Sequence, residues 1–128
     1  QVDILPADVY FKSMAQAILA ADETIQKNPQ LIQKLVRATL KGMKDIMADP
    51  KGATKVYVEH VPAHKGKEAS ILKTFELYNQ YVYAAQKTPG QMDEARLAEL
   101  QKFYVSNDVV PKEVPVKELY TNQFVMGK

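Results

Sequence analysis

The stretch NPQLIQKLVRATLKGMKDIMADPKGA, residues 28–53, contains a helix with its own start and stop signals. Asn28 is a favoured cap residue, and Pro29 suits the first helical position, where a missing N–H breaks no helical bond. Asp49 and Pro50 repeat the signal, so one helix ends and another begins there. Between the two signals, apolar residues recur with a 3.6-residue period, and we expect burial above all of Leu35, Val36, Leu40 and Met43.

The residues before this helix are harder to assign. Asp22 can accept hydrogen bonds from the free amides of a short helical turn that ends near Lys27. The preceding residues 13–21 contain the short apolar run QAILAA. Within a larger intact protein this run favours a short buried strand near residues 15–20, whereas in isolation its spacing suits a helix. Both interpretations stay open.

Three further helices follow the central one. The first starts at Pro50 and stops before Pro62, the second covers residues 68–85, and the third begins at Asp93 and stops near Asn107. The tail then favours an extended segment and a short turn. For the first of these helices we predict an inner face made of Ala53, Val56, Tyr57 and Val61. The fold class is therefore mainly α with about five helices, and we expect residues 1–128 to form a single helical domain.

Composition excludes several classes of protein. The formal charge of +2 is spread among interleaved lysines and acids, which does not indicate a nucleic-acid or anionic-lipid surface. The absence of cysteine excludes disulfides, thiolate catalysis and thiolate metal sites. No apolar run approaches the roughly 18 residues of a membrane helix. Because the chain opens on QVDILPADVY without a methionine, we expect a piece of something longer.

Candidate catalytic and metal-binding groups are sparse. His60 and His64 are the only histidines, and Pro62 between them breaks the helix that would place both on one face. A zinc site would also need a third ligand, so we predict surface or packing roles for both. No nucleophile elbow, phosphate-binding loop or dinucleotide fingerprint is present. We predict no enzymatic activity, no metal and no cofactor.

Tyrosine is the one enriched residue type, with seven copies. Tyr78, Tyr81 and Tyr83 fall within one predicted helix, where α-helical spacing cannot place all three on one face. We expect one in the core and the others at its margin, with their hydroxyl groups in solvent.

A series of short motifs resembles the bacterial periplasmic substrate-binding proteins of nitrate, sulfonate and taurine transport, a group that includes proteins similar to thiamine-pyrimidine synthases. The resemblance covers roughly residues 13–126. The motifs are the alanine-rich run at 17–21, Asp22, Asn28 with Pro29, Arg37 with Ala38 and Gly42, Pro50, PGQMD at 89–93 and ELYTNQFV at 118–125.

The resemblance implies a carboxyl-terminal portion of a two-lobe binding-protein fold that serves an ABC-type importer. Such a protein is periplasmic, is exported by a leader that this chain does not contain, and has a transporter permease and a small solute as partners. If residues 13–21 cross between lobes, Tyr10, Ser13 and Gln16 lie at the cleft and contact the ligand. One lobe would leave apolar surface around QAILAA uncovered, so we expect weak ligand binding and a homodimer of the fragment.

Two alternatives to transport remain open. In thiamine-pyrimidine synthases a histidine of the protein is consumed alongside a pyridoxal cofactor, so this chain could be a fragment of such an enzyme. A stand-alone helical interaction module would also account for exposed tyrosines. The identity of the ligand does not follow from these residues.

Overall fold

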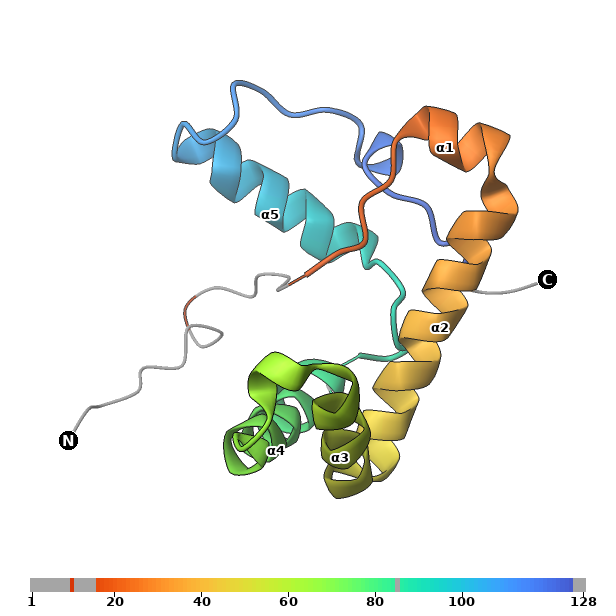
Figure 1. Cartoon of the computed structure of the whole chain (residues 1–128). Coiled ribbons are helices and arrows are strands. Elements are labelled where there is room, and N and C mark those ends of the chain that lie inside the picture. Colours follow the sequence, from red (N-terminus) through yellow and green to blue (C-terminus); the bar gives the residue numbers. More distant parts are fainter. Residues whose placement is uncertain (1–9, 11–15, 85, 126–128) are drawn as a thin grey trace. The chain divides into compact units, whose positions relative to one another are not determined.

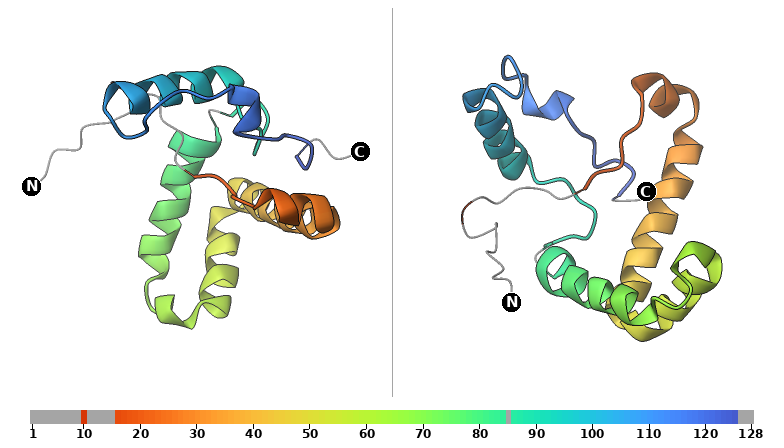
Figure 2. Two further views of the ribbon diagram at one scale, coloured as in Figure 1. Left: turned by 90° about the horizontal axis from the view of Figure 1, so that it is seen from above. Right: turned by 60° about the vertical axis from the view of Figure 1, so that its left-hand side comes forward.

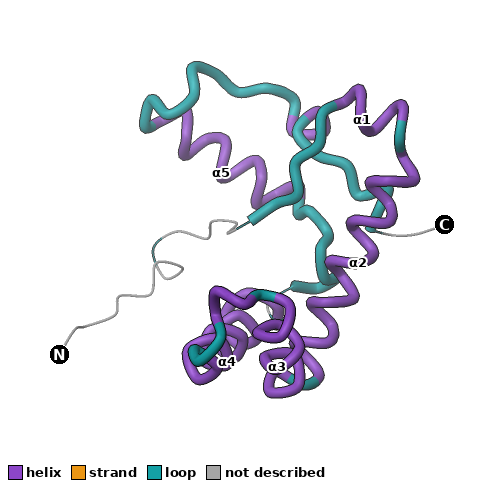
Figure 3. Tube along the Cα trace, viewed as in Figure 1, coloured by secondary structure: helices purple, strands orange, loops and turns teal. Residues whose placement is uncertain are grey.

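The computed structural model describes residue 10 and residues 16–84 and 86–125. The described residues group into two compact units. One is formed by the described residues of 20–91 with residues 124–125, and the other by residues 92–123 with the described part of 1–19. Every regular element in the described residues is helical (Figure 3). The prediction of a mainly α fold with five α-helices is confirmed.

The larger unit is built on α2, Pro29–Ala48, as Figure 1 shows. The short α1, Asp22–Lys27, leads into α2 at its amino end. At its other end α3, Pro50–His60, follows directly, and the 3-10 turn η2, Pro62–His64, connects α3 to α4, Glu68–Tyr78. α3 and α4 lie side by side and antiparallel (Figure 2). The π-helical turn η3, Asn79–Tyr83, then extends α4 and contacts α2.

The smaller unit contains α5, Glu94–Ser106, and the 3-10 turn η4, Val116–Glu118. After α5 the chain reverses through Asp108, whose φ of 56° is the one positive value at a described residue other than glycine. The tail then runs back along α5 (Figure 1). Side chains of α5 hold this tail in place, as described below.

The strand considered for residues 15–20 is absent from residues 16–20, the described part of that range. These residues form no regular element, and the helix starts only at Asp22. A strand requires a neighbour that exchanges backbone hydrogen bonds, and the described residues provide none. The helical alternative for this run is wrong over the same residues.

The helix boundaries follow the predicted signals. α2 begins at Pro29 and ends at Ala48, and α3 begins at Pro50 and ends before Pro62. The Asp49 side chain accepts a hydrogen bond from the Gly52 backbone N–H at 2.9 Å. Asn28 occupies the cap position of α2, yet its side chain makes no capping bond. The short helix α1 is preceded by Ala21 at its cap position, so Asp22 is its first residue and not its cap.

Asp49 makes a side-chain capping bond, whereas Asn28 makes none. Asp49→Ala should lower the free energy of unfolding by about 1 kcal/mol, because it removes a capping bond at the start of α3. Asn28→Ala is the matched control and should cost less than about 0.5 kcal/mol, since no side-chain bond is lost. Urea titration followed by far-ultraviolet circular dichroism measures both. Equal losses in the two variants would contradict the assignment of the caps.

Two of the predicted core positions are wrong. Leu35 is 49% exposed and Val56 is 58% exposed. In α3 the buried residues are Thr54 and Val58, and Val56 lies about 200° around the helix from Val58. In α2 the buried residue is Ile32, whereas the remaining predicted core residues of that helix, Val36, Leu40 and Met43, are half-buried.

Few apolar side chains in the described residues are buried. They are Ile32, Val58 and Phe124, all in the larger unit. Phe124 returns to α2, where its backbone carbonyl accepts a bond from the Gln33 side chain at 2.8 Å. A closed core usually contains many fully buried side chains, so the described surfaces still offer apolar area for further packing.

Candidate functional site

Of the three residues predicted to contact ligand, the structure describes two. Tyr10 is 78% exposed in a turn, and Gln16 is also exposed. Ser13 lies outside the described residues. The geometry therefore leaves the ring face of Tyr10 and the amide of Gln16 accessible, and their role in ligand binding stays a prediction.

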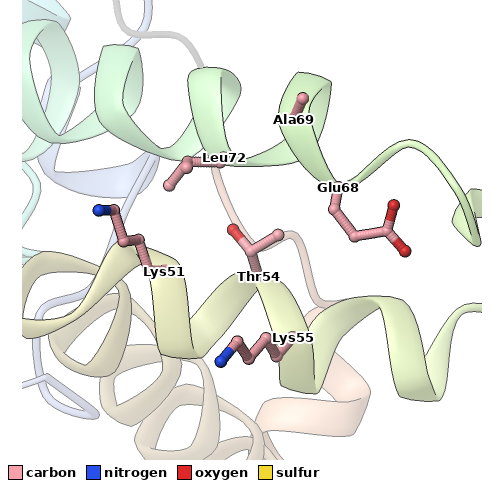
Figure 4. Close-up of a pocket in the computed structure, with 6 residues that line it drawn as sticks. All are labelled: Lys51, Thr54, Lys55, Glu68, Ala69 and Leu72. Atoms are coloured by element: carbon pink, nitrogen blue, oxygen red, sulfur yellow. The ribbon is translucent and has the colours of Figure 1, made fainter.

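A shallow groove of about 280 Å³ lies between α3 and α4. Figure 4 shows its six lining residues: Lys51, Thr54 and Lys55 from α3, and Glu68, Ala69 and Leu72 from α4. The capping bond at Asp49 fixes the start of α3, and successive turns then place its three lining residues along the groove. This groove was not predicted, because it depends on how the two helices pair.

The floor of the groove has no free polar group. Thr54 is buried, and its hydroxyl donates to the Pro50 carbonyl at 2.7 Å. The charged ends of Lys51, Lys55 and Glu68 fan outward from the floor (Figure 4). Ligand pockets normally enclose most of a small molecule and aim a few polar groups at it. This open groove does neither, so it is a poor site for a small ligand.

The charge at one end of the groove is set by local hydrogen bonds. The Glu68 carboxylate accepts from its own backbone N–H and from the Gly66 N–H, and these bonds hold its pKa below the ordinary value. The nearby Lys65 charge acts in the same direction. Glu68 is therefore ionised at neutral pH, while Lys51 and Lys55 place positive charge on the facing helix.

The two histidines have local partners. The Nδ1 atom of His64 lies 2.9 Å from the Tyr57 hydroxyl, and the two rings stack with centroids 5.5 Å apart. Tyr57 also meets Phe75 edge to face at 5.7 Å. The Nδ1 atom of His60 lies 2.9 Å from the Val56 carbonyl one turn earlier. Packing and surface roles account for both side chains, and the described residues contain no cluster of three metal-binding side chains.

The π-helical turn η3 changes which tyrosines share a face. Its five-residue repeat brings Tyr78 and Tyr83 together with ring centroids 5.7 Å apart, while Tyr81 points to solvent. Burial raises the pKa of Tyr83, and the nearby Tyr78 adds to the rise. The Asn79 side chain donates to the Ile46 carbonyl of α2 at 3.0 Å. A single π-helical turn cannot be predicted from the 3.6-residue spacing of apolar residues.

Side-chain amides hold the tail of the smaller unit. Gln101 of α5 donates to the Val114 carbonyl at 2.9 Å and accepts from the Val114 N–H at 2.8 Å. Asn122 makes the same two-bond pattern with the backbone of Met92, at 2.8 and 3.0 Å. This second amide belongs to YTN, residues 120–122, within the ELYTNQFV motif of the sequence. The motif therefore has a structural use in this unit.

Tyr120, the first residue of that motif, donates its hydroxyl to the Glu94 carboxylate at 3.2 Å. Partial desolvation raises the pKa of Tyr120, and the negative charge of Glu94 raises it further. Tyr120 therefore stays protonated and able to donate at neutral pH.

No helix among the described residues is both long enough and apolar enough to cross a membrane.

Comparison with known proteins supplies the remaining evidence. Residues 2–53 match the family model described as NMT1/THI5 like. The chain is 28% identical over 131 residues to the riboflavin-binding protein RibY of Chloroflexus aurantiacus, an alignment that covers 99% of this chain and 37% of that protein. The chain thus spans little more than a third of its relative's length. No solved structure matches. The two matches confirm the resemblance to substrate-binding proteins.

Proposed function

We propose that the chain is the carboxyl-terminal part of the solute-binding component of an ABC-type importer. It is similar to the substrate-binding proteins of the NMT1/THI5-like family. The observation that carries the proposal is the alignment with RibY, which extends over 99% of this chain but only 37% of the relative. A ligand cleft between two lobes needs both lobes, so the solute binds only to the whole protein. A transporter permease and a periplasmic location belong to the same proposal.

The name of the relative makes riboflavin the first solute to test. A flat heterocycle suits the predicted contact residues, because an aromatic ring can stack on it while hydroxyl and amide groups bond to its polar edge. The Tyr10 ring and the Gln16 amide are exposed and available for such contacts. The class of ligand proposed is therefore a flavin or a similar heterocycle.

A non-catalytic role is part of the proposal. RibY is a binding protein by name. A synthase that consumes a histidine would need that side chain at the reaction centre. Here the ring of His64 is engaged by Tyr57, and His60 lies beside a carbonyl of its own helix. These local partners favour solute binding over the synthase-like alternative.

Riboflavin titration tests the proposal. The 128-residue chain alone should bind riboflavin with a dissociation constant above about 100 µM, because one wall of a cleft leaves the ligand mostly exposed. The protein expressed from the complete reading frame that contains these residues should bind in the micromolar range. Quenching of flavin fluorescence measures both. Micromolar binding by the 128-residue chain would contradict the proposal that it is one part of the site.

The contact residues are tested in the same longer protein. Tyr10→Ala should weaken riboflavin binding at least about tenfold, which corresponds to about 1.4 kcal/mol of lost stacking. Tyr81→Ala is the matched control, since Tyr81 is also an exposed tyrosine but lies on η3. The affinity of the Tyr81→Ala variant for riboflavin should be unchanged. Equal affinities of the two variants would remove Tyr10 from the site.

Self-association of the 128-residue chain is also proposed. In the apolar run at residues 16–21, Leu19 is 91% exposed and Ile18 is 43% exposed. Exposed apolar side chains next to one another favour contact with a second copy or with another part of a longer protein.

A further inference from the structure

Helix α2 carries a second apolar stripe, centred about 90° around the helix from its buried residue, Ile32. The stripe consists of Leu31, Leu35, Ala38 and Gly42, spaced four, three and four residues apart. At about 100° per residue these positions fall within roughly 60° of one another around the helix. All four are exposed in the described structure, Leu31 to 60%. The stripe is therefore unpartnered within the described residues.

Gly42 sets the shape of this stripe. It lies inside a 20-residue helix, where glycine is the poorest helix former after proline. A Cβ atom at Gly42 would meet nothing within 4 Å, so no contact with another described residue requires a glycine there. Glycine and alanine on a helix surface let another helix approach closely. Gly42 and Ala38 thus form a hollow beside the ridge of Leu31 and Leu35.

We propose that two copies of this chain pair through the stripe, with α2 antiparallel to α2 and Leu35 of each copy seated over Gly42 of the other. The large residues occupy the amino-terminal half of the stripe and the small ones the carboxyl-terminal half. A twofold axis between Ala38 and Thr39 places Leu35 of each copy opposite Gly42 of the other, while Leu31 lies opposite Ile46. A parallel pair would instead oppose Leu35 to Leu35 and leave a gap at Gly42.

Charge along the stripe favours the same arrangement. Lys34 and Asp45 lie on one flank of the stripe, about 70° and about 50° from its centre. The antiparallel register brings Lys34 of each copy near Asp45 of the other, so two oppositely charged pairs form. A parallel pair would place the two Lys34 side chains on opposite sides of the interface, so Lys34 would not lie near Asp45 of the other copy. Asp45 already accepts a bond from Lys41 at 2.7 Å, which holds its carboxylate on this flank.

The absence of cysteine from the chain allows a clean cross-linking test. A mixture of the Leu35→Cys and Gly42→Cys proteins should form a mixed disulfide dimer at least about tenfold faster than either protein alone. In the proposed register positions 35 and 42 meet, whereas 35 and 35 lie about 10 Å apart along the axis, beyond the reach of a disulfide. Ala38→Cys alone should cross-link fast, because it lies near the twofold axis.

Sedimentation of the 128-residue chain gives the second measurement. Gly42→Glu fills the hollow with a charged side chain and should raise the dissociation constant of the dimer at least about tenfold. Lys44→Glu, on the opposite side of α2, is the matched control and should leave it unchanged. Circular dichroism confirms that both variants stay folded, as expected since Gly42 has open space around it.

This interface rests on the proposed self-association of the chain. The experiments distinguish failure of self-association from failure of the pairing through α2. A monomer at all concentrations would overturn both self-association and this interface. A dimer that cross-links through Leu19→Cys, but not through the mixed pair at 35 and 42, would place the interface at residues 16–21 and overturn the assignment to α2. Neither result bears on riboflavin binding, which is measured separately.

Discussion

Gln101→Glu is expected to lower the free energy of unfolding by about 3 kcal/mol at pH 7. Gln101 is 8% exposed, and its amide makes one donor bond and one acceptor bond to the backbone of Val114. Glutamate has nearly the same shape but replaces the amide nitrogen with oxygen. A carboxylate oxygen would then face the Val114 carbonyl, and a negative charge would be buried without a partner.

The same substitution predicts a pH dependence. Burial and the facing carbonyl should raise the pKa of the new carboxyl above its unfolded value of about 4.3. A raised folded pKa means that the unfolded chain loses its proton first, so the destabilisation grows as pH rises above about 4. Below that pH the protonated carboxyl can donate to Val114 as the amide did, and the variant should approach the parent in stability.

Urea titrations at pH 4 and pH 7 provide the measurement. Gln91→Glu is the matched control, since Gln91 is exposed and should change stability by less than about 0.5 kcal/mol at either pH. A loss in Gln101→Glu that is small at pH 7, or equal at the two values of pH, would show that the amide does not hold the tail on α5.

The helix boundaries could be predicted because their causes are local. A proline at the first helical position and an aspartate before it act within one turn, whatever surrounds them. Asp93 is a clear case, since its side chain accepts bonds from the Ala95 and Arg96 N–H groups and α5 starts at the next residue. Such short-range interactions can be predicted from the sequence alone.

The buried face of each helix was predicted less well, because it depends on the neighbours. α2 has apolar residues on two sides, and periodicity alone does not say which side meets α3 and η3. Leu35 was assigned to the core for that reason and lies on the outer stripe. The turn η3 has a similar origin, since Asn79 is held by the Ile46 carbonyl of α2, which lies 33 residues away in the chain.

In the candidate site, too, some residues could be predicted from the sequence and others could not. Tyr10, Ser13 and Gln16 came from resemblance to a family, and their role remains a prediction. The groove between α3 and α4 could not be anticipated, since its lining comes from two helices whose pairing is a tertiary event. The two-bond amide contacts of Gln101 and Asn122 likewise join side chains to distant backbone, for which a sequence pattern gives no signal.

Gly90→Ala is expected to lower the free energy of unfolding by about 2 to 3 kcal/mol. Gly90 has a φ of 81°, a left-handed conformation that costs other residues about 1 to 2 kcal/mol. A Cβ atom there would also overlap the Leu40 Cδ2 atom of α2. Moving that side chain out of its rotamer adds about 0.5 to 1.5 kcal/mol.

Two further glycines separate these contributions. Gly66 has the same φ of 81°, but a Cβ atom there would meet nothing within 4 Å, so Gly66→Ala should show the backbone cost alone. Gly42 is helical and also has open space, so Gly42→Ala should stabilise the chain by up to about 1 kcal/mol. Urea titration should therefore show that Gly90→Ala lowers the free energy of unfolding most, that Gly66→Ala lowers it less, and that Gly42→Ala raises it.

The contact with Leu40 can be isolated by a double-mutant cycle. Leu40→Ala alone removes packing from a half-buried position and should cost about 2 kcal/mol. In the Gly90→Ala background the same change also removes the overlap, so the double variant should be more stable than the sum of the single losses by about 0.5 to 1.5 kcal/mol. Additive losses, or equal costs at Gly90 and Gly66, would show that Leu40 does not pack on Gly90. The closing turn of residues 87–91 would then be held against α2 by other contacts.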